Sequence, residues 1–218
     1  MKNKYKIIKK PLVALDWLES GYTKFIAENI YNAEHENEGT LGHALHCYTG
    51  SMSEAYNRFL RETNGDIEKL NVDEDHLSFW KDTSYNIKLI YEAFNKNKIL
   101  ENIVLYHYTH INIKELLKLI KSQNGVFELK SFLSTTLIKN NMDIKLLSKQ
   151  KRFNVVFKIN TKQGTNCIPI RWRSGNKPGQ SQLMEYEVIL EPKSQLKLIK
   201  IRKKWFCKIK YELEFETI

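Results

Sequence analysis

Two carboxylates that could do chemistry together, Glu185 and Glu187, stand two residues apart with Tyr186 between them. The residues after them are apolar, which predicts a strand that is entered from a loop and ends at a turn near Pro192. Side chains two residues apart on a strand point to the same face, so both carboxylates are expected on one side. Such a pair can stabilise a developing cation and take up a proton. The alternative is an edge strand with two solvated glutamates.

Two further groups of polar residues lie at the ends or edges of predicted strands. His107 stands in the β-branched and aromatic run 102–108, and three hydroxyl residues beginning at Ser134 follow the strand-like run 126–133. Strand ends that converge on a cleft are a common way to build a small-molecule site. The alternatives are a buried core histidine and a simple strand-end turn.

The apolar pattern divides the chain into a helical first part and a β-rich second part. Helical spacing predicts helices at 12–31 with a break near 21, and at 41–47, 53–63, 73–95, 112–122 and 143–148. Strands are predicted at 102–108, 126–133, 153–159, 166–172, 183–190, 195–201 and 205–215. The predicted fold class is therefore α+β. We expect one domain over residues 1–218, mainly helical at 1–100 and β-rich at 101–218.

Composition indicates a globular chain: hydrophobic residues make up 42% and charged residues 28% of its 218 residues. The three cysteines, Cys47, Cys167 and Cys207, form no CxxC spacing, and no histidine pattern completes a ligand set, so no metal site is expected. No apolar run has transmembrane length. The basic N-terminus lacks a following apolar region, so no Sec signal peptide is expected.

The positive charge is concentrated in the second half of the chain. The formal net charge is +10, while residues 139–210 hold 18 Lys and Arg against 4 Asp and Glu. A positive field of this kind suits a phosphate-bearing ligand, an acidic protein or nucleic acid. A solvated basic surface that keeps the protein soluble explains the same numbers.

The three polar groups, in this order, resemble the mono-ADP-ribosyltransferase fold shared by bacterial toxins and their relatives. That family carries an aromatic-Arg strand, a Ser-Thr-Ser strand and a Glu/Gln-x-Glu strand. The resemblance extends from about residue 41 to the C-terminus. Ahead of these motifs, a YT turn and an N-x-x-LR helix match the family's helical segment at Tyr48, Thr49, Asn57, Leu60 and Arg61. The resemblance implies two facing, mostly antiparallel β-sheets around an NAD cleft.

One motif departs from the family pattern. His107 stands where arginine is usual, and Tyr108 stands where glycine is usual. Histidine at this place is similar to the diphtheria-toxin and poly-ADP-ribose polymerase branch, whose histidine hydrogen-bonds an NAD ribose hydroxyl. The basic residue that replaces the missing arginine stays open among Lys139, Arg171 and Arg173.

The resemblance implies a role for each residue of the site. Glu187 stabilises the ribose cation and bonds its 2′-hydroxyl, Ser134 orients that carboxylate, and Glu185 acts on the incoming nucleophile. The residues expected to bind NAD are Tyr48, Arg61, His107, Tyr108, Thr109, Ser134 and Thr135. Tyr48 and Arg61 have a purely structural alternative.

The expected function is transfer of ADP-ribose from NAD to a side chain of a target protein, with release of nicotinamide, by a bacterial effector or toxin. The basic loop 171–182, which begins at Arg171 and ends at Gln182, is expected to recognise a host protein, with Trp172 as an anchor. The alternatives are ADP-ribosylation of nucleic acid and a degenerate fold that only binds a partner. We expect a monomer that does not bind membranes and acts in the producer's cytoplasm or in a host cytosol after delivery by a dedicated secretion system.

Overall fold

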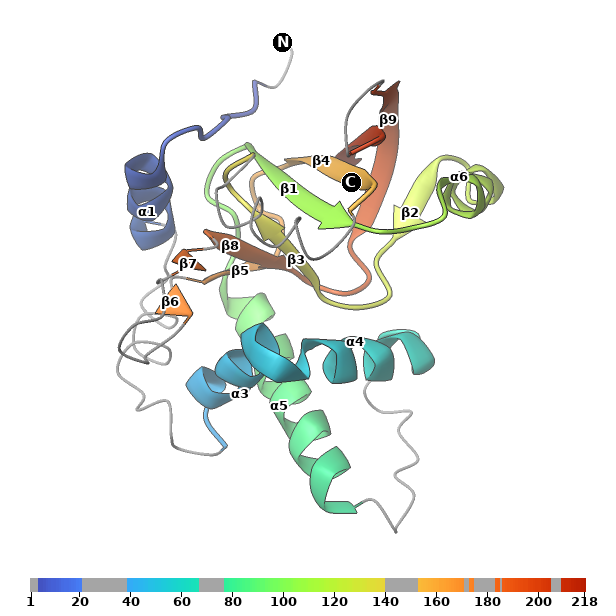
Figure 1. Cartoon of the computed structure of the whole chain (residues 1–218). Coiled ribbons are helices and arrows are strands. Elements are labelled where there is room, and N and C mark those ends of the chain that lie inside the picture. The colour runs from blue at the N-terminus through green and yellow to red at the C-terminus, as the bar shows by residue number, and fades with distance from the viewer. Residues whose placement is uncertain are drawn as a thin grey trace.

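The structure is a computed structural model that describes residues 4–20, 39–66, 77–139, 153–170, 173–174, 183–184, 186–204 and 209–218 (Figure 1). Its helices are α1 (Pro11–Ser20), α3 (Leu41–Cys47), the π-helical turn η2 (Tyr48–Met52), α4 (Ser53–Glu62), α5 (Leu77–Lys96) and α6 (Ile113–Ser122). Most of them lie where helical spacing predicts helices. The predicted helix at 143–148 and the second half of that at 12–31 fall outside the described residues.

Ten strands follow the predicted β-rich order. They are β1 (Ile103–Thr109), β2 (Val126–Glu128), β3 (Leu133–Thr136), β4 (Val155–Thr161), β5 (Cys167–Ile170), β6 (Arg173–Ser174), β7 (Leu183–Met184), β8 (Glu187–Leu190), β9 (Gln195–Lys203) and β10 (Tyr211–Thr217). Eight form one sheet in the order β2-β9-β10-β4-β1-β3-β8-β5, and β6 pairs with β7. Only the β10–β4 pair is parallel among these eight strands. The α+β class is confirmed.

The sheet has two arms that meet at a narrow junction. β1 pairs with β4 over seven residues but with β3 only at Tyr106 and Thr136. The two sheets expected from the sequence are therefore two arms of one continuous sheet. We name them the large arm (β2, β9, β10, β4, β1) and the small arm (β3, β8, β5). Apolar patterning predicts which strands form, but it does not reveal the single register pair that joins the arms.

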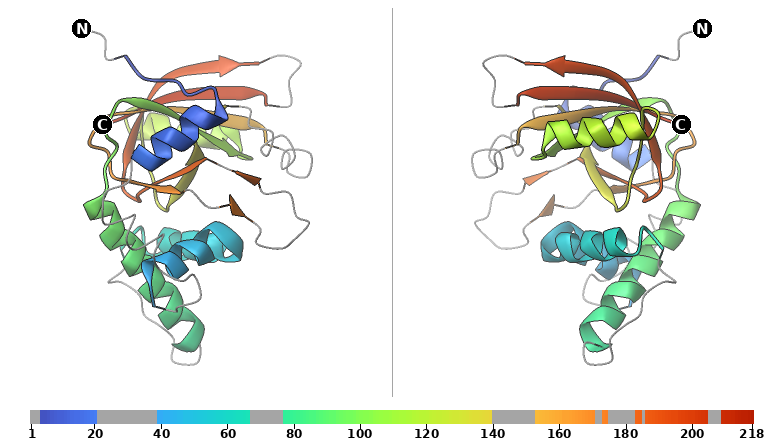
Figure 2. Two further views of the ribbon diagram at one scale, coloured as in Figure 1. Left: turned by 90° about the vertical axis from the view of Figure 1, so that its left-hand side faces the viewer. Right: turned by 90° about the vertical axis from the view of Figure 1, so that its right-hand side faces the viewer.

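Two apolar cores lie on the two faces of the small arm. Alternate residues of β8, Val188 and Leu190, pack into an inner core between the arms, together with Leu213 and Phe215 of β10. Ile189 lies between them in sequence and packs into a second cluster, the helix core, built with residues of α3, α4 and α5. Figure 2 shows these three helices as one layer beyond the small arm, while α1 and α6 flank the sheet. The small arm is thus buried on both faces.

A short turn determines where the helix layer meets the sheet. Thr40 caps the N-terminus of α3: its side chain accepts a hydrogen bond from the His43 backbone N–H at 3.2 Å. The helix continues into η2, where Gly50 leaves helical geometry with φ −92° and ψ −122°. This kink turns the chain into α4. Tyr48 therefore stands at the corner between the two helices, against the small arm.

Buried carboxylates on β10 hold the outer face of the large arm together. Glu212, whose side chain is 3% exposed, pairs with Lys139, Arg202 and Lys204. Burial raises the pKa of Glu212, but the hydrogen bonds and charges of Lys139 and Lys204 outweigh this and lower the pKa to about 2. The carboxylate is therefore ionised in the folded protein at neutral pH.

We predict that Glu212→Gln destabilises the fold by about 2–3 kcal/mol at pH 7, because it leaves three cations without their shared carboxylate. The pKa of Glu212 is lowered from 4.5 to about 2, so its stabilisation is complete above pH 4.5 and is lost as the pH falls towards 2. Urea unfolding at pH 7 and near pH 2 measures both effects. The exposed Glu92→Gln on α5 is the control. An equal penalty for Glu212→Gln at both pH values would contradict this account.

Candidate active site

Glu187 opens β8 at the centre of the small arm. Its backbone pairs with Thr136 of β3 on one side and with Ile170 of β5 on the other, and the residue is only 7% exposed. Ile189 packs into the helix core, and strand alternation places Glu187 on the same face. The carboxylate therefore faces the helix layer, in largely buried surroundings.

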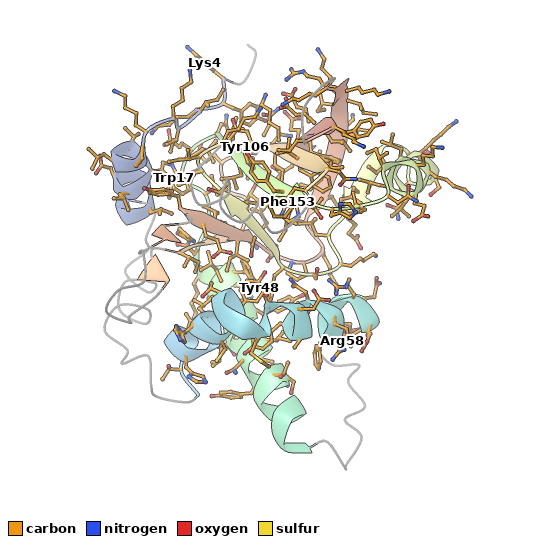
Figure 3. The ribbon with its side chains drawn as sticks, viewed as in Figure 1. Lys4, Trp17, Tyr48, Arg58, Tyr106 and Phe153 are labelled. Carbon is orange, nitrogen blue, oxygen red and sulfur yellow. The ribbon has the colours of Figure 1, made fainter. Side chains whose placement is uncertain are left out.

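Ser134 reaches the same face from the neighbouring strand. It stands opposite Ile189 in the β3–β8 register, and its Oγ lies 3.0 Å from the hydroxyl of Tyr48. Tyr48 is 1% exposed and packs edge-to-face on Phe132, with ring centroids 5.2 Å apart. Figure 3 shows Tyr48 between the helices and the sheet. The hydroxyl pair thus joins the helix layer to β3.

Tyr48 also connects Ser134 to Glu187. Burial raises the pKa of the Tyr48 hydroxyl, and the negative charge of Glu187 raises it further, while contacts with Ser134 and Asn57 lower it. The net direction is upward, so the phenol keeps its proton and acts as a neutral hydrogen-bond donor. Glu187 and Ser134 lie on the same face of the paired strands β8 and β3, and Ser134 bonds Tyr48 from that face. Tyr48 is therefore the centre of a cluster that contains Ser134, Asn57 and Glu187.

Asn57 of α4 carries an unusual atom. Its Oδ1 is buried and has no hydrogen-bond partner among the described residues. A buried acceptor without a partner costs about 1–3 kcal/mol, which a ligand hydroxyl or amide that donates to it would offset. The cluster around Tyr48 therefore has a buried acceptor that a polar ligand could use. Sequence reasoning named Asn57 as part of a helical motif but gave it no role in the site.

His107 lies on the other side of the β1–β3 junction. Its Nδ1 is 2.7 Å from the backbone carbonyl of Ser134. A carbonyl oxygen only accepts, so Nδ1 carries the proton and Nε2 is left with a lone pair. Burial lowers the pKa of His107, although the bond to Ser134 opposes that shift. The ring is therefore a neutral acceptor near pH 7, packed beside Phe157 with centroids 5.6 Å apart.

The two residues after His107 point in different directions. Tyr108 packs on Phe153, with ring centroids 6.1 Å apart, beside the small cluster of Val104 and Tyr106. Strand alternation puts this face opposite to that of His107 and Thr109. The structure therefore brings Thr109 to the side of His107 but turns Tyr108 away from it.

The other predicted NAD-binding side chains already have protein partners. The Thr135 hydroxyl donates to the carbonyl of Val188 at 2.5 Å and ties β3 to β8. Arg61 pairs with Glu54 at 2.6 Å, and both side chains are largely exposed. An exposed ion pair of this kind contributes little to stability, whereas the bond of Thr135 belongs to the sheet.

Lys139 does not lie near the cluster around Tyr48. Its Nζ bonds Glu212 at 2.5 Å and lies 5.7 Å from the centre of the Tyr106 ring. Tyr106 and His107 are neighbours on β1, so their side chains point to opposite faces. This removes Lys139 from the three basic residues considered as substitutes for the missing arginine.

The predicted strand 183–190 is interrupted. Tyr186 has a φ of 47°, a left-handed conformation that ends strand geometry. The residues before it pair with β6 as a separate two-stranded ribbon. The unbroken strand from which Glu185 and Glu187 were expected to share a face is therefore wrong. Glu185 and most of the loop 171–182, including Arg171 and Trp172, lie outside the described residues.

Two kinds of feature are absent from the part of the chain that the structure describes. Its residues contain no group of three or more His, Cys, Asp or Glu side chains arranged to hold a metal ion. Its helices include none that is long and apolar enough to cross a membrane.

Comparison with known families identifies the chain. The profile of the ADP-ribosyltransferase exoenzyme family matches residues 18–211. The chain belongs to this family. It is an NAD-dependent mono-ADP-ribosyltransferase of the bacterial toxin type, and NAD is its substrate. None of the curated proteins matches it closely enough to add a relative.

Solved structures share the fold at low sequence identity. An ADP-ribosyltransferase from Clostridium botulinum is 16% identical with a TM-score of 0.66, and the alignment covers 99% of each chain. The Clostridium limosum C3 exoenzyme is 17% identical with a TM-score of 0.67, covering 99% of this chain and 98% of that one. The ADP-ribosylating toxin BECa of C. perfringens, solved with NADH, is 19% identical with a TM-score of 0.67, covering 99% of this chain and 50% of that one.

We predict that His107 is neutral in the Nδ1–H form and titrates below its usual pKa of 6.5, because burial penalises the imidazolium. Below pH 6.5 the unfolded chain binds the proton first, so His107 makes the fold less stable as the pH falls. Two-bond ¹H–¹⁵N NMR spectra across a pH titration report both the tautomer and the pKa. The imidazole signals that are missing from the spectrum of His107→Gln are those of His107. A Nε2–H form, or a pKa above 6.5, would show that the imidazole is arranged differently.

Proposed function

We propose that the enzyme transfers ADP-ribose from NAD to a side chain of a target protein, with Glu187 as the residue that stabilises the reacting ribose. The observation that carries this proposal is the cluster in which Glu187, Ser134 and Tyr48 meet on one face of the small arm. Members of the matched family perform this chemistry. A buried carboxylate can stabilise the ribose cation, and neighbouring hydroxyl donors can hold that carboxylate in place.

The chemistry assigned to Glu187 is electrostatic. Cleavage of the bond between ribose C1′ and the nicotinamide nitrogen sends the bonding electron pair to nicotinamide and leaves positive charge on the ribose. A carboxylate at 7% exposure meets that charge at a low local dielectric, where the interaction is stronger than in water. The same carboxylate can accept a hydrogen bond from the ribose 2′-hydroxyl.

Ser134 and Tyr48 position this carboxylate. Their hydroxyls bond each other at 3.0 Å, and Tyr48 keeps its proton because burial and Glu187 both raise its pKa. A phenol that stays neutral can donate to a neighbouring carboxylate without competing for its charge. Both residues are thus assigned as positioning residues, and Glu187 as the catalytic residue.

His107 is assigned to a ribose hydroxyl of NAD. Its Nδ1 is fixed on the Ser134 carbonyl, so Nε2 is the atom that accepts from the ligand. A neutral acceptor cannot neutralise the diphosphate, which therefore needs a cation from elsewhere. Arg61 is the described candidate, because its exposed pair with Glu54 can be exchanged for phosphate. Arg171 and Arg173 remain the other candidates.

The acceptor side of the reaction is assigned to Glu185 and the loop 171–182. Attack by a protein side chain forms a bond to ribose C1′ and releases a proton, which a carboxylate at Glu185 would take. The basic character of the loop favours an acidic surface on the target protein. The same character leaves nucleic acid as the alternative acceptor.

We predict that Glu187→Gln lowers both ADP-ribose transfer and NAD hydrolysis by about 100- to 1,000-fold, because it removes the charge that meets the ribose cation. Glutamine keeps the shape of the side chain, so NAD affinity measured by calorimetry and the melting temperature should change little. Nicotinamide release and transfer from labelled NAD, measured side by side, test this prediction.

Glu191→Gln provides the matched control for Glu187→Gln. Glu191 follows the other end of β8, and its carboxylate accepts from Asn166 at 2.9 Å, a bond that glutamine can keep. The control should retain wild-type turnover. If Glu187→Gln binds NAD normally and turns over like the control, Glu187 is not catalytic and a partner-binding role for the fold becomes the better explanation.

We predict that Glu185→Gln separates the two activities. Transfer to the target should fall by about 100-fold or more, because the base for the incoming nucleophile is lost. NAD hydrolysis should persist, because the carboxylate at Glu187 is intact. Labelled NAD with a eukaryotic lysate in one arm and RNA or DNA in the other reports transfer and identifies the acceptor class. Equal loss of both activities would assign Glu185 to NAD itself.

A further inference from the structure

A pocket of about 310 Å³ lies on the outer face of the large arm, on the opposite side of β1 from His107. Ile7, Ile8 and Lys9 of the N-terminal segment form one wall. The segment is held there by backbone hydrogen bonds that join Lys6 to Asn102 and Val104. The sheet provides the other wall through Tyr106, Lys139, Lys158, Arg202 and Glu212. Tyr106 lies on the side of β1 that faces this segment (Figure 3).

The charges around this pocket do not balance. Four cations line the pocket: Lys9, Lys139, Lys158 and Arg202. A fifth, Lys204, follows the end of β9 and pairs with Glu212 in the pocket wall. Against these five positive charges stand two carboxylates, Glu212 and Glu214. Both have a lowered pKa, because lysine hydrogen bonds and charges outweigh the effect of burial. The pocket therefore keeps a surplus of three positive charges at neutral pH.

The cations still have donors to offer. Lys139 and Lys158 each have three N–H donors, of which the structure's described contacts use one, to Glu212 and Glu214 respectively. Arg202 has five N–H donors and donates one hydrogen bond to Glu212 and one to Glu214. A ligand can therefore be bound without breaking the network that holds the sheet.

The acceptors, in contrast, are occupied. One oxygen of Glu212 accepts from Arg202, and the other accepts from Lys139 and contacts Lys204 at 3.0 Å. Glu214 accepts from Lys158, Asn160 and Arg202. A pocket with spare donors, filled acceptors and surplus positive charge favours an anion over a cation or a neutral sugar.

We propose that this pocket binds a small organic phosphate that carries two or more phosphate monoester groups, which NAD lacks, at a site separate from that of NAD. Phosphoryl oxygens match the fork of Arg202 and the point charges of the lysines. Ile7 is 48% exposed at the rim and offers an apolar surface to the organic part of the ester. Inorganic phosphate alone would use only part of such a pocket.

An inositol trisphosphate is the probe that fits this description. Calorimetry with the whole chain, at low and at physiological salt, measures its affinity. Lys9→Gln should weaken binding about fivefold, the effect of one partly exposed charged contact. Lys9 is exposed and carries none of the sheet's ion pairs among the described contacts, so this variant keeps the fold. The neighbouring Lys10→Gln removes the same charge outside the pocket and should bind like the wild type.

Arg202→Lys gives a second, charge-conserving test. It keeps the positive charge beside Glu212 but loses the planar fork, so affinity should fall about three- to tenfold while the melting temperature stays close to that of the wild type. Glu187→Gln, and saturation of the wild type with NAD, should leave probe affinity unchanged, because the pocket and His107 lie on opposite faces of β1.

The same chemistry occurs in a free ester and in a lipid headgroup. Flotation with phosphatidylcholine vesicles, with and without a phosphatidylinositol bisphosphate, distinguishes the two sources. Binding of the soluble probe alone supports a free ester, and binding of the lipid vesicles that Lys9→Gln weakens supports a headgroup. The proposal is overturned if the probe does not bind at low salt, if Lys9→Gln and Lys10→Gln weaken it equally, or if NAD displaces it.

Discussion

The contact between the hydroxyls of Tyr48 and Ser134 is the point on which the active site depends. It joins a corner of the helix layer to a central strand of the small arm, where Tyr48 is 1% exposed and Ser134 is half-buried. A hydroxyl buried there without a partner would be costly, so the contact fixes the distance between helix and strand. Glu187 lies on the same face of the small arm as Ser134, and its negative charge raises the pKa of Tyr48.

Histidine in place of arginine at position 107 changes which groups this strand position offers to a ligand. An arginine at this strand position would bring a permanent charge and a fork of donors. His107 instead donates to a backbone carbonyl and keeps one acceptor, which in the proposed function accepts from a ribose hydroxyl of NAD. Under the proposed function the cation that neutralises the diphosphate comes from another element. The candidate among the described residues is Arg61 of α4, a helix that packs on the small arm.

Sequence reasoning recovered the features that local patterning controls. The β-branched run of β1, the amphipathic helices α4 and α6, and the glutamate of β8 all follow from spacing and residue type. It failed where one residue's backbone decides the outcome, as at Tyr186, whose left-handed φ is not typical of an aromatic residue. It left Lys139 open as one of three candidates for the missing arginine, because the partner of a lysine depends on which face of a distant strand, β10, carries a carboxylate.

The narrow junction between the arms means that few hydrogen bonds fix the angle between them. Tyr106 and Thr136 are the one register pair that joins β1 to β3. Beside this pair, the His107 side chain donates a hydrogen bond to the backbone carbonyl of Ser134. A change in the angle between the two arms would break few backbone hydrogen bonds. It would, however, change the distance between the imidazole of His107 on the large arm and the carboxylate of Glu187 on the small arm.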